Sequence, residues 1–537
     1  MFEVSNQPPP LEPYNLFASD TVLRAAVKRE RAGWADDGLT ALGATLGKPE
    51  TIQLGFDANK YTPVLRTLDR FGHRLDEVDY HPAWHALMAI ALRAGLHSSP
   101  WADPKPGAHV ARAAGTYMLN QIESGVYCPL AMTYGSVPTL RYTPAIAAEW
   151  LPRIFARDYD RRFRPAGEKT SALIGMGLTE NQGGSDLRTN STRAEPAGDG
   201  SVRLYGHKWF MSAPMCDAFL VLAQSAKGLS CFLMPRWTPG GERNAMHIVR
   251  LKDKLGNRSN ASSEVEFDGA TAQLVGEEGR GIPIIIEMAG HTRLDCCIGS
   301  SSLMRQAVAQ AVHHARHRTA FQKRLIDQPL MSNVLADLAL ESEAATVLTM
   351  RLARAYDECD EVSTVFRRVV TPAAKFWICK RAPFVTLEAM EVLGGSGYIE
   401  ESILPRLYRE APVNSIWEGA GNIMCLDVLR ALERTPKAAE VLRHELAEAG
   451  DARLQAFAER LQQRLRAADR NDESQARVLV RDLVLALQAA LLIKHAPPAV
   501  AEAFCASRLG ADGGGAFGTL PRGLDLHALA ERAAPQN

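Results

Sequence analysis

The sequence predicts a multidomain α+β protein in which a central β domain follows one helical domain and precedes two more. Three observations support this class. The length of 537 residues exceeds what one hydrophobic core organises, helical spacing of apolar residues dominates both ends, and short strand-like runs gather between them. We expect a mostly helical N-terminal domain at 1–170, a β domain at 171–277, a helical bundle at 278–434 and a C-terminal helical domain at 435–537.

The first two domains differ in their residue patterns. From about Asp20 to Arg164 the chain is rich in Ala and Leu at helix-compatible spacing. After Ser171, short apolar runs such as Phe219 to Leu222 and Glu264 to Phe267 alternate with polar turns. Such runs are typical of a domain of several strands.

Helical periodicity returns in the last two domains. Between residues 279 and 434, apolar side chains such as Leu338 and Leu352 recur on one helix face, which is the pattern of a helical bundle. After Thr435 the chain is rich in Arg, Glu, Ala and Leu, and Asp512 to Gly518 forms a glycine-rich break. We interpret this tail as a separate helical domain.

Charge and cysteine content exclude several classes of protein. Lys and Arg total 61 and Asp and Glu total 61, so the whole chain has no field that attracts nucleic acid or an anionic membrane. Nine cysteines without a C-x-x-C pair fit reduced, buried thiols. Met1 to Tyr14 lacks a signal-peptide pattern, and no apolar run reaches the ~18 residues that span a bilayer, so we expect a cytoplasmic protein without membrane contact.

Two groups of histidines have spacings that could bind a metal. His81 and His85 stand four residues apart, and His313, His314 and His317 crowd one helical segment. Neither group has an evident acidic or thiol third ligand. We therefore predict solvated or hydrogen-bonded histidines and no metal site.

The segment Gly177 to Asp186 carries the strongest chemical signal. It combines two hydroxyls, two carboxylates and a glycine pair, which can bring backbone N–H groups and hydroxyls close to a large polar cofactor. A Gly/Ser-rich turn without a ligand is the alternative interpretation. A second segment, Ser415 to Asn422, places the carboxylate of Glu418 between an aromatic residue and a glycine. Together the two segments indicate a cofactor and a base.

Both segments resemble signatures of the acyl-CoA dehydrogenase family of flavoproteins. Gly177 to Asp186 matches the first signature, except that Thr189 stands at its last small position. Glu391 to Tyr398 is similar to the second signature, which normally opens with Gln. Trp417-Glu418-Gly419 resembles the segment that carries the catalytic base.

A further motif resembles the family's contact with the cofactor of a neighbouring subunit. Arg318, Phe321 and Gln328 match the residues that contact the diphosphate and adenine of FAD, although Gln322 stands where the family has Gly. The resemblance implies an N-terminal helical domain, a β-barrel-like central domain and a helical bundle. It also implies FAD as cofactor and a homotetramer.

The resemblance implies a role for each part of the site. Glu418 would remove the α-proton of an acyl thioester while the β-hydrogen leaves as hydride to the flavin, and apolar neighbours would raise the pKa of Glu418. Arg293 matches an active-site arginine, with a helix-surface salt bridge as an equal alternative. The implied cofactor-binding residues are Met176, Leu178, Thr179, Gly184, Ser185, Phe210, Met211, Ser212, Arg318, Phe321, Gln328, Glu391, Gly394, Gly395, Trp417, Gly419, Gly421 and Asn422.

The C-terminal domain points to a second activity. Its charges nearly balance, and interleaved carboxylates favour a salt-bridged solvated face from the residues alone. The whole chain, however, resembles a subgroup of the family whose fourth helical domain is implicated in binding double-stranded DNA. The candidate DNA-binding residues are Arg430, Arg453, Arg460, Arg464, Arg470, Arg477 and Arg481.

The resemblance implies two functions. Because the chain is similar to the subgroup of the alkylation response, we favour an FAD-containing protein that binds double-stranded DNA in the response to alkylation damage and has weak or residual acyl-CoA dehydrogenase activity. The alternative is a genuine dehydrogenase of short branched-chain acyl-CoA, with Glu418 as base and an electron-transfer partner that reoxidises the flavin.

Overall fold

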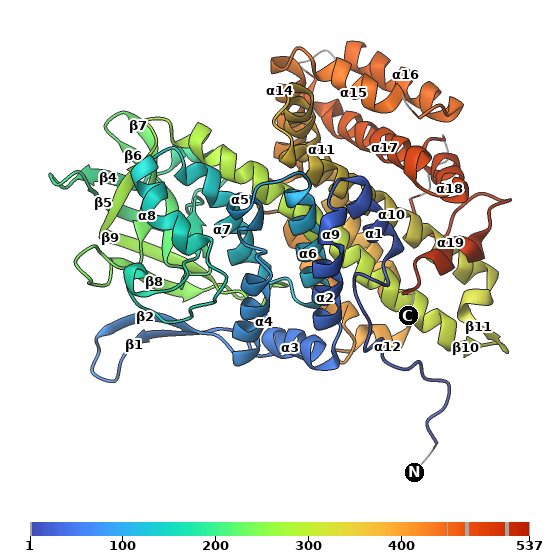
Figure 1. Cartoon of the computed structure of the whole chain (residues 1–537), viewed down its shortest axis with the longest axis horizontal. Helices are drawn as coiled ribbons and strands as arrows, with labels where there is room; N and C mark the ends of the chain where they lie inside the picture. Colours follow the sequence, from blue (N-terminus) through green and yellow to red (C-terminus); the bar gives the residue numbers. More distant parts are fainter. Residues whose placement is uncertain (1–2, 448, 468–471, 511–514, 536–537) are drawn as a thin grey trace. The chain divides into compact units, whose positions relative to one another are not determined.

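The computed structural model describes residues 3–447, 449–467, 472–510 and 515–535. Contacts divide the chain into two compact units, each assembled from separate segments. Figure 1 labels the helices and strands along the chain. Unit 1 contains residues 1–49, 105–121 and 293–537, and unit 2 contains residues 50–104 and 122–292. The predicted α+β class is confirmed by this order of helices and strands.

Unit 2 is built around a seven-stranded sheet. Its strands are β3 (Ile174–Gly177), β4 (Arg193–Pro196), β5 (Val202–Ser212), β6 (Ala218–Ser225), β7 (Gly228–Pro235), β8 (Met246–Leu251) and β9 (Ser262–Val275). Their order is β3-β5-β4-β6-β7-β9-β8, and an additional β5–β9 pairing closes a ring of strands, so the sheet is barrel-like as predicted. Nearly every residue of β6 is buried, which explains its continuous apolar run.

Helices complete unit 2. They are α3 (Pro49–Lys60), α4 (Pro82–Arg93), α5 (Ser99–Ala102), α7 (Tyr127–Leu140), α8 (Pro144–Ile154), η2 (Ala166–Glu168), η3 (Leu187–Thr189) and the first turns of α9 (Gly281–His317). A hairpin of β1 (Val64–Leu68) and β2 (Arg74–Asp79) is an addition that the helical pattern did not predict. Its turn depends on local polar contacts, because Asp69 accepts backbone hydrogen bonds from Phe71 and His73.

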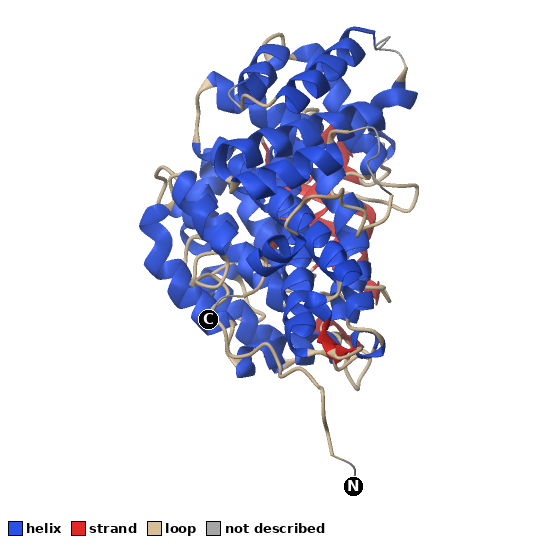
Figure 2. Cartoon of the chain, turned by 90° about the vertical axis from the view of Figure 1, so that its right-hand side faces the viewer, coloured by secondary structure: helices blue, strands red, loops and turns tan. Residues whose placement is uncertain are grey.

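Unit 1 is almost entirely helical, as the ribbon coloured by secondary structure shows (Figure 2). Besides the rest of α9, its long helices are α10 (Pro329–Asp357) and α11 (Glu361–Val392). Leu338, Leu348 and Leu352 of α10 are fully buried, in agreement with the predicted apolar face. The shorter elements are α1 (Thr21–Arg29), η1 (Gly33–Ala35), α2 (Asp36–Leu46), α6 (Ala108–Ile122), β10 (Thr319–Ala320), β11 (Lys323–Arg324), η4 (Leu325–Asp327), α12 (Gly395–Tyr398), α13 (Leu404–Glu410), η5 (Ala411–Ser415) and α14 (Gly421–Arg434).

The C-terminal helices also belong to unit 1. They are α15 (Ala438–Ala447), α16 (Ala452–Ala467), η6 (Glu473–Gln475), α17 (Ala476–His495), α18 (Pro498–Arg508) and α19 (Leu526–Arg532). Helix α17 packs against α10, α11, α14, α16 and α18. The predicted glycine-rich break at 512–518 lies partly outside the described residues. No described helix is both long and apolar enough to cross a membrane.

Candidate functional site

The segment Gly177 to Asp186 forms the end of β3 and the loop after it in unit 2. Glu180 in this loop is fully buried, and its carboxylate accepts hydrogen bonds from Lys208 Nζ at 2.7 Å and from the Ser191 backbone N–H at 2.6 Å. Burial alone would raise the pKa of Glu180, but the Lys208 ammonium and these hydrogen bonds lower it to about 2. Glu180 therefore anchors the loop to β5 instead of facing a ligand.

Two hydroxyls of the same segment are available to a ligand. Thr179 is half-buried and Ser185 is exposed. In the described part of the chain, neither hydroxyl has a protein hydrogen-bond partner. A Cβ at Gly184 would lie 2.4 Å from Thr179 Oγ1, so only glycine lets the loop fold back this closely. Met176 and Leu178, also predicted to contact the cofactor, are half-buried beside these residues.

Strand β5 presents alternate side chains to opposite faces. Phe210 is 49% exposed and Ser212 is half-buried, whereas the intervening Met211 is fully buried. Met211 therefore has no exposed surface, and its backbone carbonyl oxygen accepts a hydrogen bond from the Ser263 hydroxyl at 2.8 Å. The Lys252 ammonium lies 4.6 Å from the Phe210 ring centroid and 3.7 Å from that of Trp209. Trp209 and Lys252 were not predicted, although Trp209 adjoins Phe210 in the sequence.

Glu418 lies in unit 1, in the loop between η5 and α14. Its φ of 57° is in the left-handed region that non-glycine residues rarely adopt, and Gly419 follows with φ of 109°. A Cβ at Gly419 would lie 2.4 Å from Met424 Cε. The indole of Trp417 donates a hydrogen bond to the Asn414 side chain at 3.0 Å. These contacts give the loop one conformation, with Glu418 half-exposed.

Arg293 of α9 contacts the backbone of this loop. Its Nε donates to the Glu418 carbonyl oxygen at 3.0 Å, and its Nη1 pairs with Asp427 Oδ2 at 2.9 Å. Arg368 of α11 binds the other oxygen of Asp427 at 2.8 Å. Arg293 therefore forms an ion pair, as one of the two interpretations from the sequence expected, and it also contacts the backbone of the Glu418 loop.

A tight hairpin brings Arg318, Phe321 and Gln328 together in unit 1. Gln328 Nε2 donates to the Ala320 carbonyl oxygen at 2.9 Å, which fastens the hairpin β10–β11 to the start of α10. Phe321 is 94% exposed, and Phe321 and Gln322 have φ values of 49° and 62°. Two consecutive positive φ values define a turn that favours glycine, which explains the Gly found in the family motif at position 322.

The remaining predicted cofactor residues lie at helix ends in unit 1. Three exposed residues lie where α11 ends and α12 begins: Glu391 in the last turn of α11, Gly394 in the link with φ of 59°, and Gly395 at the start of α12. Gly421 begins α14, where Asn422 accepts a hydrogen bond from Arg477 at 2.8 Å. The Asn422 side chain is therefore directed to the C-terminal helices.

Three candidate DNA-binding arginines are paired with carboxylates. Arg453 binds both Asp451 and Glu502, each at 2.8 Å. Arg464 and Arg481 share Asp482, at 3.6 Å and 2.8 Å. These contacts are the salt-bridged face that the residue pattern alone favoured.

Two of the other candidate arginines have neutral hydrogen-bond partners. Arg460 donates to the Leu509 carbonyl oxygen at 3.1 Å, and Arg477 donates to Asn422. Arg430, Arg460 and Arg477 are exposed, and within the described ranges none of the three forms an ion pair with a carboxylate. Arg470 lies outside the described residues. Each of α14, α16 and α17 therefore carries one exposed candidate arginine that has no ion-pair partner among the described residues.

The histidine groups make local contacts. His85 Nδ1 lies 2.9 Å from the Tyr159 hydroxyl, and burial lowers the pKa of His85 to about 4. His313 Nε2 lies 2.8 Å from the Pro9 carbonyl oxygen. In the parts of the chain that the structure describes, no group of three His, Cys, Asp or Glu side chains could hold a metal ion.

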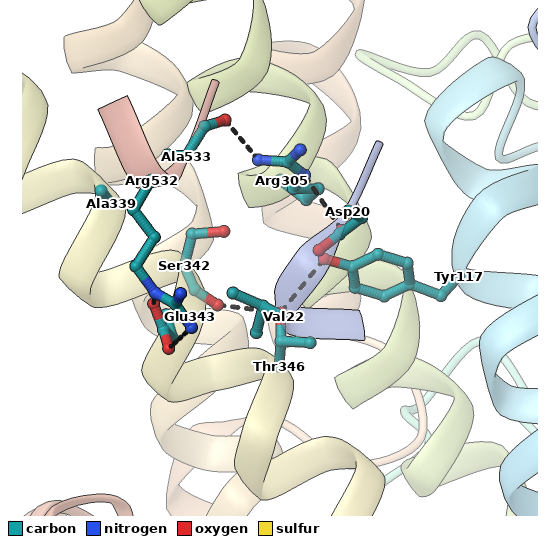
Figure 3. Close-up of a pocket in the computed structure, with 10 residues that line it drawn as sticks. All are labelled: Asp20, Val22, Tyr117, Arg305, Ala339, Ser342, Glu343, Thr346, Arg532 and Ala533. Carbon is teal, nitrogen blue, oxygen red and sulfur yellow. Dashed lines mark hydrogen bonds and ion pairs between the residues drawn. The ribbon is translucent and has the colours of Figure 1, made fainter. Parts of the chain in front are cut away.

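A small polar pocket in unit 1 was not predicted (Figure 3). Arg305 pairs with Asp20 at 3.0 Å and donates to the Ala533 carbonyl oxygen at 2.6 Å. Arg532 of α19 binds both oxygens of Glu343 at 2.8 Å. These ion pairs and hydrogen bonds therefore connect the last helix, α19, to α1, α9 and α10.

Models of three known protein domains match successive parts of the chain. The N-terminal domain model of the adaptive response protein AidB matches residues 6–161. The middle-domain and C-terminal-domain models of acyl-CoA dehydrogenase match residues 175–270 and 279–433. These matches define the class, an acyl-CoA dehydrogenase fold with an additional C-terminal segment.

Comparison with individual proteins narrows this class to one branch. It is 50% identical over 517 residues to AidB of Escherichia coli (strain K12), covering 95% of each chain. The chain belongs to the acyl-CoA dehydrogenase family, in its AidB branch.

Two solved structures show the same fold. Caenorhabditis elegans ACDH-11, in complex with C11-CoA, matches 99% of this chain and 93% of its own with a TM-score of 0.85 at 26% identity. An acyl-CoA dehydrogenase of Bacillus anthracis complexed with FAD has a TM-score of 0.66 at 19% identity, covering 85% of this chain and 84% of its own. The predicted acyl-CoA dehydrogenase-like architecture is confirmed.

Proposed function

We propose that this protein is an FAD-containing oxidoreductase that removes hydrogen from the α and β carbons of an acyl-CoA. The observation that carries the proposal is the Glu418 loop, which holds a carboxylate on strained backbone between Trp417 and Gly419. Membership of the family supports the reaction class. The C11-CoA complex of the nematode protein supports the substrate class, and the FAD complex of the Bacillus protein supports the cofactor.

The residues of the first signature fit FAD. The unpartnered hydroxyls of Thr179 and Ser185 and the close backbone at Gly184 supply donors for a polar ring or a phosphate. The exposed ring of Phe210 offers an apolar surface to a flat group. Arg318 would bind the diphosphate of the FAD that a neighbouring subunit holds. When bound, FAD would supply the hydride acceptor.

Glu418 would act as the base that takes the α-proton. A positioned base contributes about 10² to 10⁴ in rate. Backbone strain at functional residues costs about 1–3 kcal/mol and persists only where the surroundings impose it, as the contacts of this loop do. A protein electron carrier would reoxidise the flavin after each turnover.

The test is anaerobic mixing of the purified, FAD-loaded protein with a short branched-chain acyl-CoA. The proposal expects loss of the visible absorbance of the oxidised flavin at a rate that rises with acyl-CoA concentration. An absorbance that does not change at saturating acyl-CoA would contradict it.

Replacing Gly184 by Ala is expected to lower the FAD content of the purified protein. The added Cβ would lie 2.4 Å from Thr179 Oγ1, so the loop must move away from the hydroxyls that we assign to FAD. Flavin per protein chain, measured after dialysis, checks this. Gly183→Ala is an unsuitable comparison because its φ of 136° adds strain, whereas Gly167→Ala adds a methyl group with nothing within 4 Å and should keep the flavin.

A second function, binding of double-stranded DNA during the response to alkylation damage, is supported by a separate observation. Arg430, Arg460 and Arg477 are exposed, and among the described residues no carboxylate neutralises them, so each can neutralise a phosphate. The 50% identity to AidB extends over the C-terminal helices as well. The paired arginines weaken this proposal relative to the first, because binding DNA would cost their ion pairs.

Replacing Arg430, Arg460 and Arg477 together by Gln is expected to weaken binding to duplex DNA. The slope of log Kd against log salt should fall by about one for each phosphate that the variant no longer neutralises. The matched control is Arg453→Gln, whose guanidinium already binds two carboxylates. Equal salt slopes for the triple variant and the unmodified protein would exclude these residues from a DNA interface. Point variants are preferable to truncation because α17 is packed into unit 1.

We also propose a homo-oligomer, a tetramer by family likeness. Unit 1 exposes large apolar side chains that water disfavours, namely Phe321, Leu330, Phe384, Leu387, Tyr398 and Ile399. Light scattering on the purified protein tests the assembly, and a monomeric mass would contradict it.

A further inference from the structure

Lys375 is a buried cation at the loop that carries Glu418. It lies on α11 and is only 1% exposed, which places it among the largest fully buried side chains of the protein. Its ammonium donates to the Trp417 carbonyl oxygen at 2.7 Å and to the Gly419 carbonyl oxygen. A buried lysine is costly unless acceptors satisfy it, and here the acceptors are the peptide groups on either side of Glu418.

Arg293 completes this arrangement. Its Nε donates to the carbonyl oxygen of Glu418 itself. Three consecutive carbonyl oxygens, at 417, 418 and 419, therefore accept hydrogen bonds from cationic side chains of α9 and α11. Hydrogen bonds to charged donors are about twice as strong as neutral ones, so they can hold a backbone that would otherwise relax.

The loop needs such support because its conformation is strained. Glu418 has φ of 57°, and an L-residue in this region costs about 1–3 kcal/mol relative to ordinary backbone. If the ammonium were absent, the peptide groups at 417 and 419 would lose their shared partner and could rotate. Rotation about Glu418 would turn its carboxylate to a different direction.

On this basis we propose that Lys375 is a positioning residue, which fixes the left-handed backbone at Glu418 and so aims the carboxylate. The inference rests on the proposed role of Glu418 as base. Lys375 itself does not touch the substrate in this scheme. Its contribution is the orientation of the base, which a static charge bound to the loop backbone can supply without taking part in proton transfer.

The test compares Lys375→Met with the unmodified, FAD-loaded protein. Methionine has a similar length but carries no charge and cannot donate a hydrogen bond. The rate of flavin reduction at saturating acyl-CoA should fall by about 10²-fold, the usual cost of misplacing a reacting group by about 1 Å, while the half-saturating acyl-CoA concentration stays unchanged. The control is Lys437→Met, an exposed lysine that pairs with Glu361 and should leave the rate unchanged.

A second measurement does not depend on catalysis. Hydrogen exchange of the backbone amides of residues 415–421 should be faster in Lys375→Met than in the unmodified protein, and unchanged in Lys437→Met. If the unmodified protein does not reduce its flavin, the proposed function is wrong. The hydrogen-exchange comparison then tests by itself whether Lys375 holds the loop. If flavin is reduced normally by Lys375→Met, or if exchange is unchanged, the role proposed for Lys375 is wrong.

Lys375→Gln is the second variant in case Lys375→Met does not fold. Its shorter amide can still donate to one carbonyl, so we expect a smaller loss of rate with the same unchanged half-saturating concentration. A parallel loss of rate, acyl-CoA affinity and FAD content would indicate a general structural role and overturn the proposal. So would failure of both variants to fold.

Discussion

Replacing Glu418 by Gln is expected to slow flavin reduction by acyl-CoA by about 10² to 10⁴-fold. Glutamine has nearly the same shape and keeps the hydrogen bond that Arg293 donates to the backbone carbonyl oxygen of residue 418, but its amide cannot accept the α-proton. Acyl-CoA should still bind and change the flavin spectrum without bleaching it. Stopped-flow absorbance under anaerobic conditions measures both effects.

The control for this variant is Glu401→Gln, which replaces an exposed residue in the link between α12 and α13. It should leave rate and FAD content unaltered. Glu418→Gln should also retain its FAD content, which separates loss of the base from loss of the cofactor. If Glu418→Gln reduces its flavin at the unmodified rate, Glu418 is not the base.

The second large effect is expected for Lys208→Met. This change leaves the Glu180 carboxylate buried without its ion-pair partner, which costs about 3–5 kcal/mol of folding free energy. The loop from Glu180 to Ser191 should loosen at the same time, since Lys208 fastens it to β5. We expect a lower midpoint of unfolding by denaturant together with a lower FAD content.

The double variant Glu180→Gln with Lys208→Met separates charge from packing. The glutamine that replaces Glu180 carries no charge to leave unpaired, and its carbonyl oxygen can still accept the backbone hydrogen bond of Ser191. The double variant should therefore recover part of the stability that Lys208→Met loses. If the double variant is as unstable as Lys208→Met, the buried charge is not the cause of the loss.

The same pair predicts a loss of stability in acid. Glu180 has an ordinary pKa of 4.5, which the fold lowers to about 2. The unfolded chain therefore binds this proton at a higher pH than the folded protein does. The contribution is complete above pH 4.5 and is lost as the pH falls toward 2, and Glu180→Gln should remove this part of the acid dependence.

Much of the fold and part of the site were predictable from residue patterns. The run Phe219 to Leu222 became a fully buried strand, and the glycine at 184 proved necessary for a close approach to Thr179. These features depend on residues that are near in sequence, so local patterns carry them. The hairpin β1–β2 was not predicted because polar contacts of Asp69 define its turn while its strands bury little apolar surface.

Other parts of the site depend on contacts between distant residues. Arg453 looked like a DNA contact in a helical stripe, but Glu502 of α18 neutralises it. No motif singled out Lys375, whose ammonium binds carbonyl groups more than forty positions away. Neither partner could be identified from spacing, because a side chain of four or five bonds can reach any of several neighbouring elements.

The sequence by itself determined the class of this protein. Local motifs identify its cofactor segments and its Glu418 segment, and periodicity identifies its order of helical and β domains. Only the tertiary structure decided which charges are free to act. Hydrogen bonds form only at contact distance, and Coulomb attraction weakens with distance and is screened by water. The packing that brought Glu180 to Lys208 and Lys375 to the Glu418 loop therefore determined which ionic groups hold the fold and which remain available for chemistry.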